Sequence, residues 1–152
     1  MAKFNNRDSL KISVINYDKF ITSIEDEAFQ RGRKRCDILI HCNTHKYFIL
    51  GELKDRSPKG KVRSGAKKQL LSSLQTLIAV SEINAYAGLA GVKKCCYFNK
   101  QSTAPTTLNA TTAFNRLSNV YPDGFQMNNP DMEALGFQFY EYTGLQTVSL
   151  TK

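Results

Sequence analysis

The sequence predicts an α/β protein in which helices flank a central mixed β-sheet. Two short, isoleucine-rich runs at residues 36–42 (CDILIHC) and 47–55 (YFILGELKD) are separated by a polar turn, which is typical of a hairpin of buried strands. A long amphipathic segment follows at 66–83, and another apolar run comes after it at 92–98. A hairpin, a helix and a further strand in this order favour a sheet that a crossover helix covers.

Residues 10–30 are expected to form the first helix. Asp8 or Ser9 is available as an N-cap, and the apolar residues of the segment follow at mostly helical spacing. These apolar residues are Ile12, Ile15, Phe20, Ile24 and Phe29. The segment Arg31–Arg35, in which four of five residues are basic, is expected to end the helix and lead into the first strand of the hairpin.

The segment after the hairpin, residues 55–68, is polar and contains Pro58, Gly60 and Gly65, so a loop that runs into a helix start is expected. The helix itself, over 66–83, carries an apolar stripe, which predicts that it packs on the sheet. The stripe consists of Leu70, Leu71, Leu74, Leu77 and Ile78.

The rest of the chain predicts one or two more strands, over 137–142 and 146–150. Gly88–Gly91 is interpreted as the end of a helix and a turn. Residues 99–130 are rich in Asn, Thr, Ser and Pro, and one short helix near 111–119 is expected there.

The composition indicates one domain, residues 1–152, because a chain of 152 residues with 41% hydrophobic content suffices for one core but not for two ordinary domains. Lys and Arg total 21 against 13 Asp and Glu, and the net charge of +8 favours a polyanionic partner, nucleic acid before a membrane surface. No apolar run approaches the roughly 18 residues of a spanning helix, so membrane association is not expected. The N-terminus shows no apolar run of signal-peptide length, which predicts a cytoplasmic protein.

The four cysteines are expected to be reduced and buried in that compartment. They are Cys36, Cys42, Cys95 and Cys96. Together with His41 and His45 they match no standard zinc spacing, so a zinc site is not expected.

The hairpin brings acidic residues together. Alternate residues of a strand share a face, so Glu52 and Lys54 lie on the same face of the second strand. A four-residue turn at 43–46 would place Asp37 directly opposite Glu52, with Cβ atoms about 5 Å apart. A two-residue turn would instead leave Glu52 on the diagonal from Asp37, about 7 Å away.

Two carboxylates this close on buried strands are costly unless a cation lies between them. We therefore expect Asp37 and Glu52 to bind Mg²⁺, with Mn²⁺ as a substitute, because carboxylate oxygens are the ligands of hard cations. Lys54 is placed about 6 to 7 Å further along the same face. A hard cation and an ammonium group are what phosphodiester hydrolysis requires, to activate water and to stabilise charge in the transition state.

Asp37, then fourteen residues, then Glu52-Leu53-Lys54 among apolar strand residues resembles the PD-(D/E)xK signature of restriction-endonuclease-like nucleases. The resemblance implies a restriction-endonuclease-like core: a helix, a hairpin with the acidic residues, a crossover helix and a further strand. It implies that Asp37, Glu52 and often the backbone carbonyl of Leu53 bind the metal, and that Lys54 assists attack by water. Gln69 is carried over as a catalytic residue, from members with a glutamine on the helix after the triplet.

The sequence departs from the family pattern at Cys36, where the signature has proline. An ideal helix also places Gln69 about 140° around from Leu74, so either the first turn of the helix is irregular or Gln69 faces solvent. Many members add an acid from the first helix. Glu25 and Glu27 both remain candidates for that role.

Two basic stretches flank the predicted site and are expected to contact phosphates of nucleic acid, DNA before RNA. The candidate residues are Arg33, Arg35, Lys59, Lys61, Arg63 and Lys67. The resemblance further implies a homodimer if both strands of a duplex are cut, and an acidic inhibitor protein if the enzyme is a toxin.

The leading functional hypothesis is a small magnesium-dependent nuclease, an endonuclease of restriction, repair or toxin type. The alternative is a catalytically inactive subunit or interaction domain that keeps the nuclease fold and binds nucleic acid. A metal titration distinguishes them. If the site is degenerate, wild type and the Asp37→Ala variant would bind metal equally well. A third hypothesis, a basic α/β protein without nucleic-acid function, predicts weak and salt-insensitive DNA binding.

Overall fold

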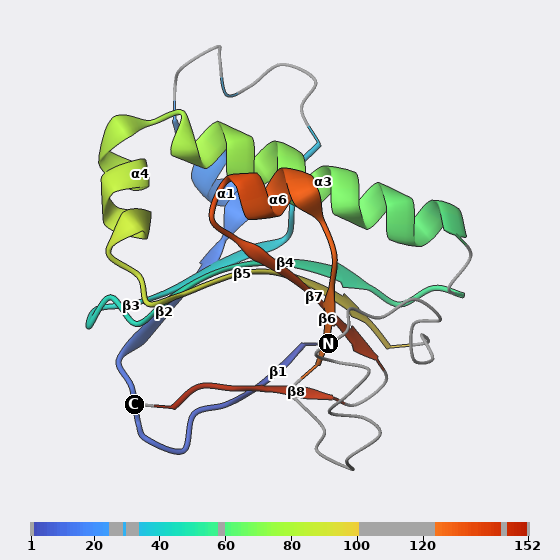
Figure 1. The fold of residues 1–152 in the computed structure, drawn as a ribbon, viewed down its shortest axis with the longest axis horizontal. Helices are drawn as coiled ribbons and strands as arrows, with labels where there is room; N and C mark the ends of the chain where they lie inside the picture. Colours follow the sequence, from blue (N-terminus) through green and yellow to red (C-terminus); the bar gives the residue numbers. More distant parts are fainter. Residues whose placement is uncertain are drawn as a thin grey trace.

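The computed structural model describes residues 2–24, 29, 34–57, 60–100, 124–143 and 146–151. Over these ranges a six-stranded mixed sheet carries helices on one face and a two-stranded sheet on the other (Figure 1). The predicted fold class, an α/β protein with a mixed sheet flanked by helices, is confirmed. No helix in the described ranges has the length and apolar character needed to cross a membrane.

The strands of the large sheet follow the order β2-β3-β4-β5-β7-β6. Their bounds are β2 Ile12–Asn16, β3 Ile38–Cys42, β4 Tyr47–Lys54, β5 Val92–Asn99, β6 Phe125–Met127 and β7 Gln138–Thr143. β2, β3 and β4 are antiparallel, whereas β4, β5 and β7 are parallel to one another. The parallel block brings the carboxyl ends of three strands to one edge, the place where α/β sheets bind ligands.

Two helices connect β4 to its parallel neighbour β5 and cover the sheet on one face. They are α3 (Gly60–Ile78) and α4 (Ser81–Gly88). Two shorter helices, α1 (Tyr17–Thr22) and α6 (Pro130–Ala134), lie on the same side of the sheet (Figure 1). Each short helix begins at an asparagine whose side chain accepts a backbone N–H of the first turn, which caps it.

The large sheet separates two hydrophobic cores. On the helix side, Leu39 of β3 and Leu50 of β4 pack in one cluster with Leu74 of α3. On the other side, Ile49 packs in a second cluster with Val148 of β8. β8 (Thr147–Ser149) pairs in parallel with β1 (Lys3–Asn5) to form the small sheet. The alternation of β3 and β4 residues between these cores fixes which side chains face α3.

The prediction of one helix over residues 10–30 is wrong in its first half. That half forms β2, the edge strand beside β3, and α1 begins only afterwards. The N-cap is Asn16, not Asp8 or Ser9. The run ISVIN is rich in β-branched residues, which favour strands, and its pairing with β3 outweighs the helical spacing of its isoleucines.

The predicted loop over 55–68 is wrong from residue 60 onward, because α3 begins at Gly60 and includes Gly65. Glycine is tolerated in a helix at a cost in propensity, so neither residue marks a turn here. The helix expected over 66–83 is two helices, α3 and α4, with a break between them. The short helix expected near 111–119 lies outside the described residues.

The hairpin, the strand after the helices and the two C-terminal strands are confirmed, with ends shifted by one or two residues. The end of a helix expected near Gly88 is confirmed as the end of α4. The four cysteines are free and buried, as predicted. The sequence does not predict β1, β6 or α6, each of which is five residues long or shorter.

Candidate active site

The register of the β3–β4 hairpin is the one that a four-residue turn requires. Ile38, the first residue of β3, is opposite Gly51, so Asp37 and Glu52 are the next residues beyond this pair on the two chain segments. The turn is closed by the His45 N–H, which donates to the Cys42 carbonyl at 2.9 Å. The four-residue turn at 43–46 is therefore confirmed, and the charge of Asp37 acts on Glu52.

Asp37 is held in place by the backbone on both sides. Its N–H donates to the Gly51 carbonyl at 3.0 Å, and its own carbonyl accepts the Tyr17 N–H at 3.0 Å. Its carboxylate oxygen Oδ2 accepts the Leu53 N–H at 2.6 Å. Within the described part of the chain, its other oxygen, Oδ1, has no hydrogen-bond or ion-pair partner. One side of the Asp37 carboxylate is thus fixed, and the other is available to a ligand.

Glu52 is fully buried, with 0% of the residue exposed. The Lys54 ammonium forms an ion pair with its carboxylate, and Lys54 keeps 24% of its side chain exposed. Apart from that ion pair, no donor among the described residues reaches either carboxylate oxygen of Glu52. The pKa of Glu52 is raised to about 7: burial raises it most, Lys54 lowers it, and the charge of Asp37 raises it.

This arrangement fits a divalent cation. A buried carboxylate with unused lone pairs, next to a second carboxylate, is costly without a positive partner, and one lysine offers a single charge. The two acids form a pair and not a larger cluster, because no group of three or more His, Cys, Asp or Glu side chains suited to a metal occurs in the described ranges. Glu25 and Glu27, the candidates for a third acid, lie outside those ranges.

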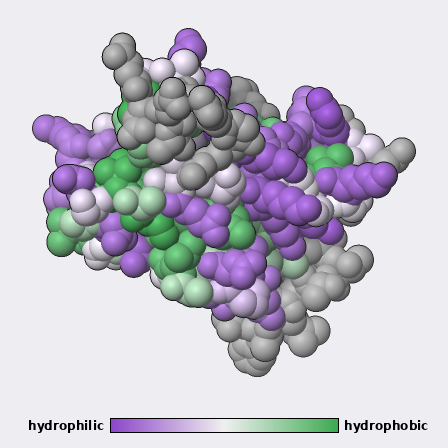
Figure 2. All heavy atoms as spheres, turned by 90° about the horizontal axis from the view of Figure 1, so that it is seen from above, coloured by the Kyte–Doolittle hydropathy of each residue, from purple (hydrophilic) through white to green (hydrophobic). Residues whose placement is uncertain are grey.

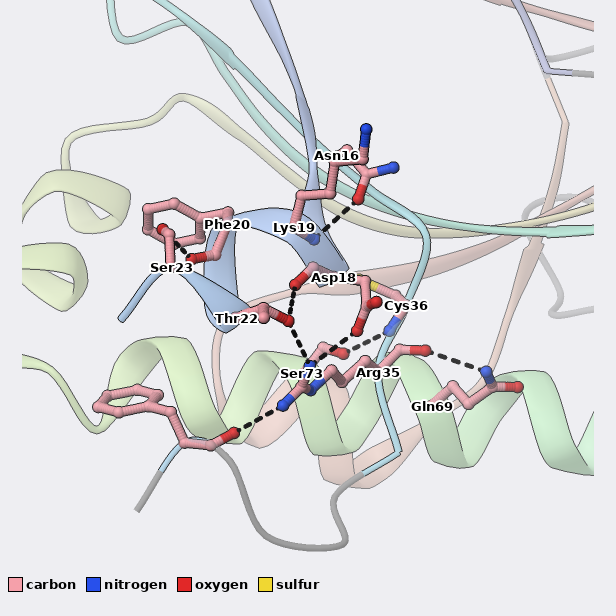
Figure 3. A network of polar contacts seen from close by, with 11 residues as sticks. Asn16, Asp18, Lys19, Phe20, Thr22, Ser23, Arg35, Cys36, Gln69 and Ser73 are labelled. Atoms are coloured by element: carbon pink, nitrogen blue, oxygen red, sulfur yellow. Dashed lines mark hydrogen bonds and ion pairs between the residues drawn. The ribbon is translucent and has the colours of Figure 1, made fainter. Parts of the chain in front are cut away.

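The sequence leaves two possibilities for Gln69, an irregular first turn of the helix or a side chain that faces solvent, and the structure shows an intermediate case. Gln69 is half-buried, and its Nε2 donates to the Arg35 carbonyl at 3.0 Å, just before β3 (Figure 3). The buried face of α3 is centred on Ala66, Leu70 and Ser73, not on Leu74. Gln69 is only about 40° from Ser73 around the helix, so it lies at the border of the buried face.

Ser73 of α3 anchors the start of β3. Its hydroxyl accepts the Cys36 N–H at 2.7 Å, and its carbonyl accepts the Tyr17 hydroxyl at 3.0 Å. With Gln69, it holds the residues that directly precede Asp37 against α3 (Figure 3). Two side chains of one helix therefore set the position of the first acidic residue.

A cleft of about 320 Å³ lies between α3 and the carboxyl end of β4. Its lining residues are Lys54, Arg56, Lys61, Val62, Gly65 and Gln69. Lys54 connects the cleft to the carboxylates, because it lines the cleft and pairs with Glu52. Hydrophilic residues gather over the half of the helix-covered face where α3 begins, and most of the hydrophobic surface lies toward α4 (Figure 2).

Some of the predicted phosphate-binding residues have partners within the fold, and one is exposed in the cleft. Arg35 pairs with Asp18 of α1 at 2.8 Å, and Arg63 pairs with Glu141 of β7 at 3.0 Å. Lys67 lies over the ring of Phe139, with Nζ 5.2 Å from the ring centroid. Arg35, Arg63 and Lys67 thus have contacts within the fold. Lys61 is exposed in the cleft, and Arg33 and Lys59 lie outside the described residues.

The structure adds a polar pair on β5 that the sequence analysis missed. Tyr97 is opposite Glu52 and Asn99 is opposite Lys54, on the same face of the sheet. The Asn99 side chain donates to the Tyr97 hydroxyl at 3.0 Å and accepts the Arg56 N–H at 3.4 Å. Asn99 thereby ties the residues after β4 to β5. Only the pairing of β4 with β5 reveals these neighbours, and a single sequence does not give that pairing.

Glu141 is a second missed residue, fully buried on β7. It is opposite Tyr97, so it occupies the same row across the sheet as Glu52, two strands away. Burial raises its pKa, and Arg63 and Lys67 oppose the shift. The sequence does hold a signal for it, since Glu141 follows Phe137 and Phe139 at the two-residue spacing of a buried strand face.

The zinc site that the sequence disfavours has no support in the described part of the chain. His41 Nδ1 and the Tyr86 hydroxyl form a hydrogen bond of 2.9 Å, and His45 packs edge-on against the same ring. The His41–Tyr86 pair lines an apolar cavity of about 220 Å³ below α4. The histidines therefore belong to an aromatic cluster at the far end of the hairpin from Glu52.

Comparison of the chain with protein-family models, curated proteins and solved structures found no match. The function is therefore inferred from the chemistry of the site alone.

Proposed function

We propose that this protein is a divalent-metal-dependent nuclease with a restriction-endonuclease-like core, which hydrolyses phosphodiester bonds of DNA at Asp37, Glu52 and Lys54. The observation that carries the proposal is the fully buried carboxylate of Glu52, which faces Asp37 and has Lys54 as its one partner among the described residues. A hairpin, a crossover through α3 and α4 and a parallel strand follow the order that the resemblance implies. The net charge of +8 supports a polyanionic substrate.

Each residue of the site has a proposed role. Asp37 and Glu52 would hold Mg²⁺ or Mn²⁺, which supplies Lewis-acid activation of water and of the phosphate. The Leu53 N–H keeps the Asp37 carboxylate in one orientation, and a role of the Leu53 carbonyl as a ligand stays a prediction. Lys54 balances the charge of Glu52 and presents its ammonium to the cleft, where it stabilises charge on the phosphate oxygens.

Gln69 acts as a positioning residue in this proposal. Its side chain holds the Arg35 carbonyl and thereby the approach to Asp37. It also lines the cleft beside Lys54, so its amide is within the space that a bound strand would occupy. Loss of Gln69 is therefore expected to lower activity less than loss of a carboxylate.

Cleavage assays on four substrates test the proposal: plasmid, linear duplex, single-stranded DNA and RNA, each with Mg²⁺ or Mn²⁺. Wild type is expected to cut DNA, and Asp37→Asn and Lys54→Ala to lower the rate by about 10² to 10³-fold. Glu82→Gln and Lys11→Ala are matched controls, because both residues are exposed and neither lies at the site.

Wild-type protein that is folded and leaves every substrate intact with both metals would overturn the catalytic proposal. Retained DNA binding in that case would favour the inactive, nucleic-acid-binding alternative. Cleavage that persists in both site variants would show that the activity lies elsewhere.

A further inference from the structure

Gly65 is unusual among the residues that line the cleft. It lies in the interior of α3, a helix of 19 residues, where glycine is destabilising relative to alanine. A Cβ built on Gly65 meets no atom within 4 Å. The described part of the protein therefore has room for a side chain at this position, and packing does not explain the glycine. Glycine also serves where a ligand approaches the backbone closely. The bare backbone at Gly65 gives the cleft a wall that a bound molecule can contact.

The charges around this wall suit a phosphate. Arg56 and Lys61 are exposed side chains of the cleft, one from the residues after β4 and one from the first turn of α3. Lys54 lies at the inner end, against Glu52. The cleft is thus lined by three cations and by the side-chain amide of Gln69. Nucleic-acid backbones are held by such groups.

The size and depth of the cleft restrict the form of the substrate. Its volume of about 320 Å³ is at the low end of the range of about 300 to 1,000 Å³ for small-ligand pockets. That space accommodates a single nucleotide unit and not a duplex. Glu52 has no exposed surface, but its partner Lys54 lines the cleft, so a phosphate in the cleft lies next to the buried acid's counter-charge.

We propose that the cleft seats one unpaired nucleotide next to the scissile phosphate, with its phosphate between Arg56 and Lys61 and its sugar against Gly65. This inference rests on the proposed nuclease function and specifies its substrate class as DNA that is single-stranded at the site. An overhang, a flap or a single strand fits this description, and an intact blunt duplex does not.

Binding measured without metal tests the cleft separately from catalysis. Fluorescein-labelled octathymidylate is titrated with wild type and variants in EDTA, and fluorescence anisotropy gives Kd over a range of salt concentrations. Gly65→Leu is expected to raise Kd at least fivefold with an unchanged salt dependence, because it fills the cleft and removes no charge. Arg56→Ala and Lys61→Ala are expected to raise Kd and to reduce the salt slope by about 0.7 each.

Two matched controls accompany these variants. Gly88→Leu makes the same substitution at another helical glycine with open space around it, at the end of α4. Lys11→Ala removes an exposed charge just before β2, near the turn end of the hairpin. Both are expected to leave Kd within twofold of wild type.

Cleavage then tests the substrate class. The same labelled strand is supplied alone, as a blunt duplex and as a duplex with a flap, with Mg²⁺. At least tenfold faster cleavage of the single strand or the flap is expected, together with a loss of that preference in Gly65→Leu. Equal cleavage of all three, or an unchanged Kd in Gly65→Leu, would overturn the inference and leave the nuclease proposal intact. Weakened octathymidylate binding in Gly65→Leu without cleavage of any substrate would instead overturn the nuclease proposal and support the cleft as a strand-binding site.

Discussion

Glu52 and Glu141 are two fully buried glutamates in one row of the sheet, with Tyr97 between them, yet their surroundings differ. Glu141 has cations as its charged neighbours, an ion pair with Arg63 at 3.0 Å and the charge of Lys67 from α3. Glu52 has one cation from its own strand and faces a second carboxylate. Burial raises the pKa of both glutamates, but two cations oppose the shift at Glu141, whereas at Glu52 one cation opposes it and a second carboxylate adds to it.

Under the proposed function, this difference assigns Glu141 to the stability of the fold and Glu52 to the metal site. A buried ion pair such as Arg63–Glu141 fixes the position of α3 on β7, because breaking it leaves a charge without its partner. A pair of acids that share one lysine is poorly explained by stability, because like charges at close range raise the free energy of the fold. Functional sites are where such arrangements concentrate.

Metal binding is expected to show the largest contrast between the two acids. Glu52→Gln should weaken Mn²⁺ binding by about a hundredfold or more, since it removes a charged ligand. Glu141→Gln should leave Mn²⁺ affinity within about threefold of wild type. Isothermal titration calorimetry with Mn²⁺ at pH 8 measures both. Equal affinities of the two variants would contradict the assignment.

The pH dependence of metal binding sharpens the contrast. Glu52 must lose its proton to bind a cation, and burial raises its pKa to about 7. Mn²⁺ affinity of wild type is therefore expected to fall about tenfold per pH unit below pH 7 and to level off above it. Titrations at pH 5.5, 6.5, 7.5 and 8.5 test this expectation. A flat profile would show that Glu52 is ionised throughout and that the pair is less buried in solution.

Stability without metal is expected to depend on the charge of Glu52 more than on the charge of Glu141. The folded pKa of Glu52 lies above its ordinary value of 4.5, so the native state holds the proton more tightly. The metal-free protein therefore loses stability as the pH rises from about 4.5 to about 7. Glu52→Gln removes this loss and should stabilise the protein by about 1 to 3 kcal/mol at pH 8 in EDTA.

Glu141→Gln also removes a carboxylate whose pKa burial raises, but it leaves Arg63 without its ion-pair partner, so it should stabilise the protein less than Glu52→Gln does, or destabilise it. Urea unfolding in EDTA at pH 5 and pH 8 gives both free energies. Destabilisation by both substitutions at pH 8 would mean that Glu52, like Glu141, serves mainly in a structural ion pair.

The smallest change in the free energy of unfolding is expected for a substitution of Gly65, which lines the cleft. Gly65→Ala places a methyl group in open space and improves helix propensity, so it should stabilise the protein by about 0.5 to 1 kcal/mol. Thermal unfolding measures the change. Gly51→Ala is the contrasting variant, because a Cβ there would lie 2.7 Å from the Ile38 side chain and is expected to destabilise.

Much of the site could be predicted from the sequence because it rests on local rules. Strand alternation and turn length predict the register of β3 with β4, and with it the face of β4 that Glu52 and Lys54 share. The position of Gln69 stayed open because the buried face was expected to centre on Leu74, whereas that face is centred on Ser73 and its neighbours.

The parts that the sequence did not predict depend on distant contacts. The neighbours of Glu52 on β5, Tyr97 and Asn99, follow from a parallel pairing across α3 and α4, which local pattern does not encode. The edge strand β2 is predicted as helix because Ile12 and Ile15 are three residues apart, which is a helical spacing, and only the pairing of β2 with β3 overrides it. The ion pair of Arg63 with Glu141 joins segments 78 residues apart.

The most direct test of the central claim is cleavage of a labelled single strand by wild type, Glu52→Gln and Glu141→Gln with Mg²⁺ at pH 8, with folding of each protein verified by circular dichroism. The account predicts cleavage by wild type, a rate within about tenfold of it for Glu141→Gln, and a loss of about a thousandfold for Glu52→Gln. Equal rates for the two variants, or no cleavage by folded wild type, would contradict it.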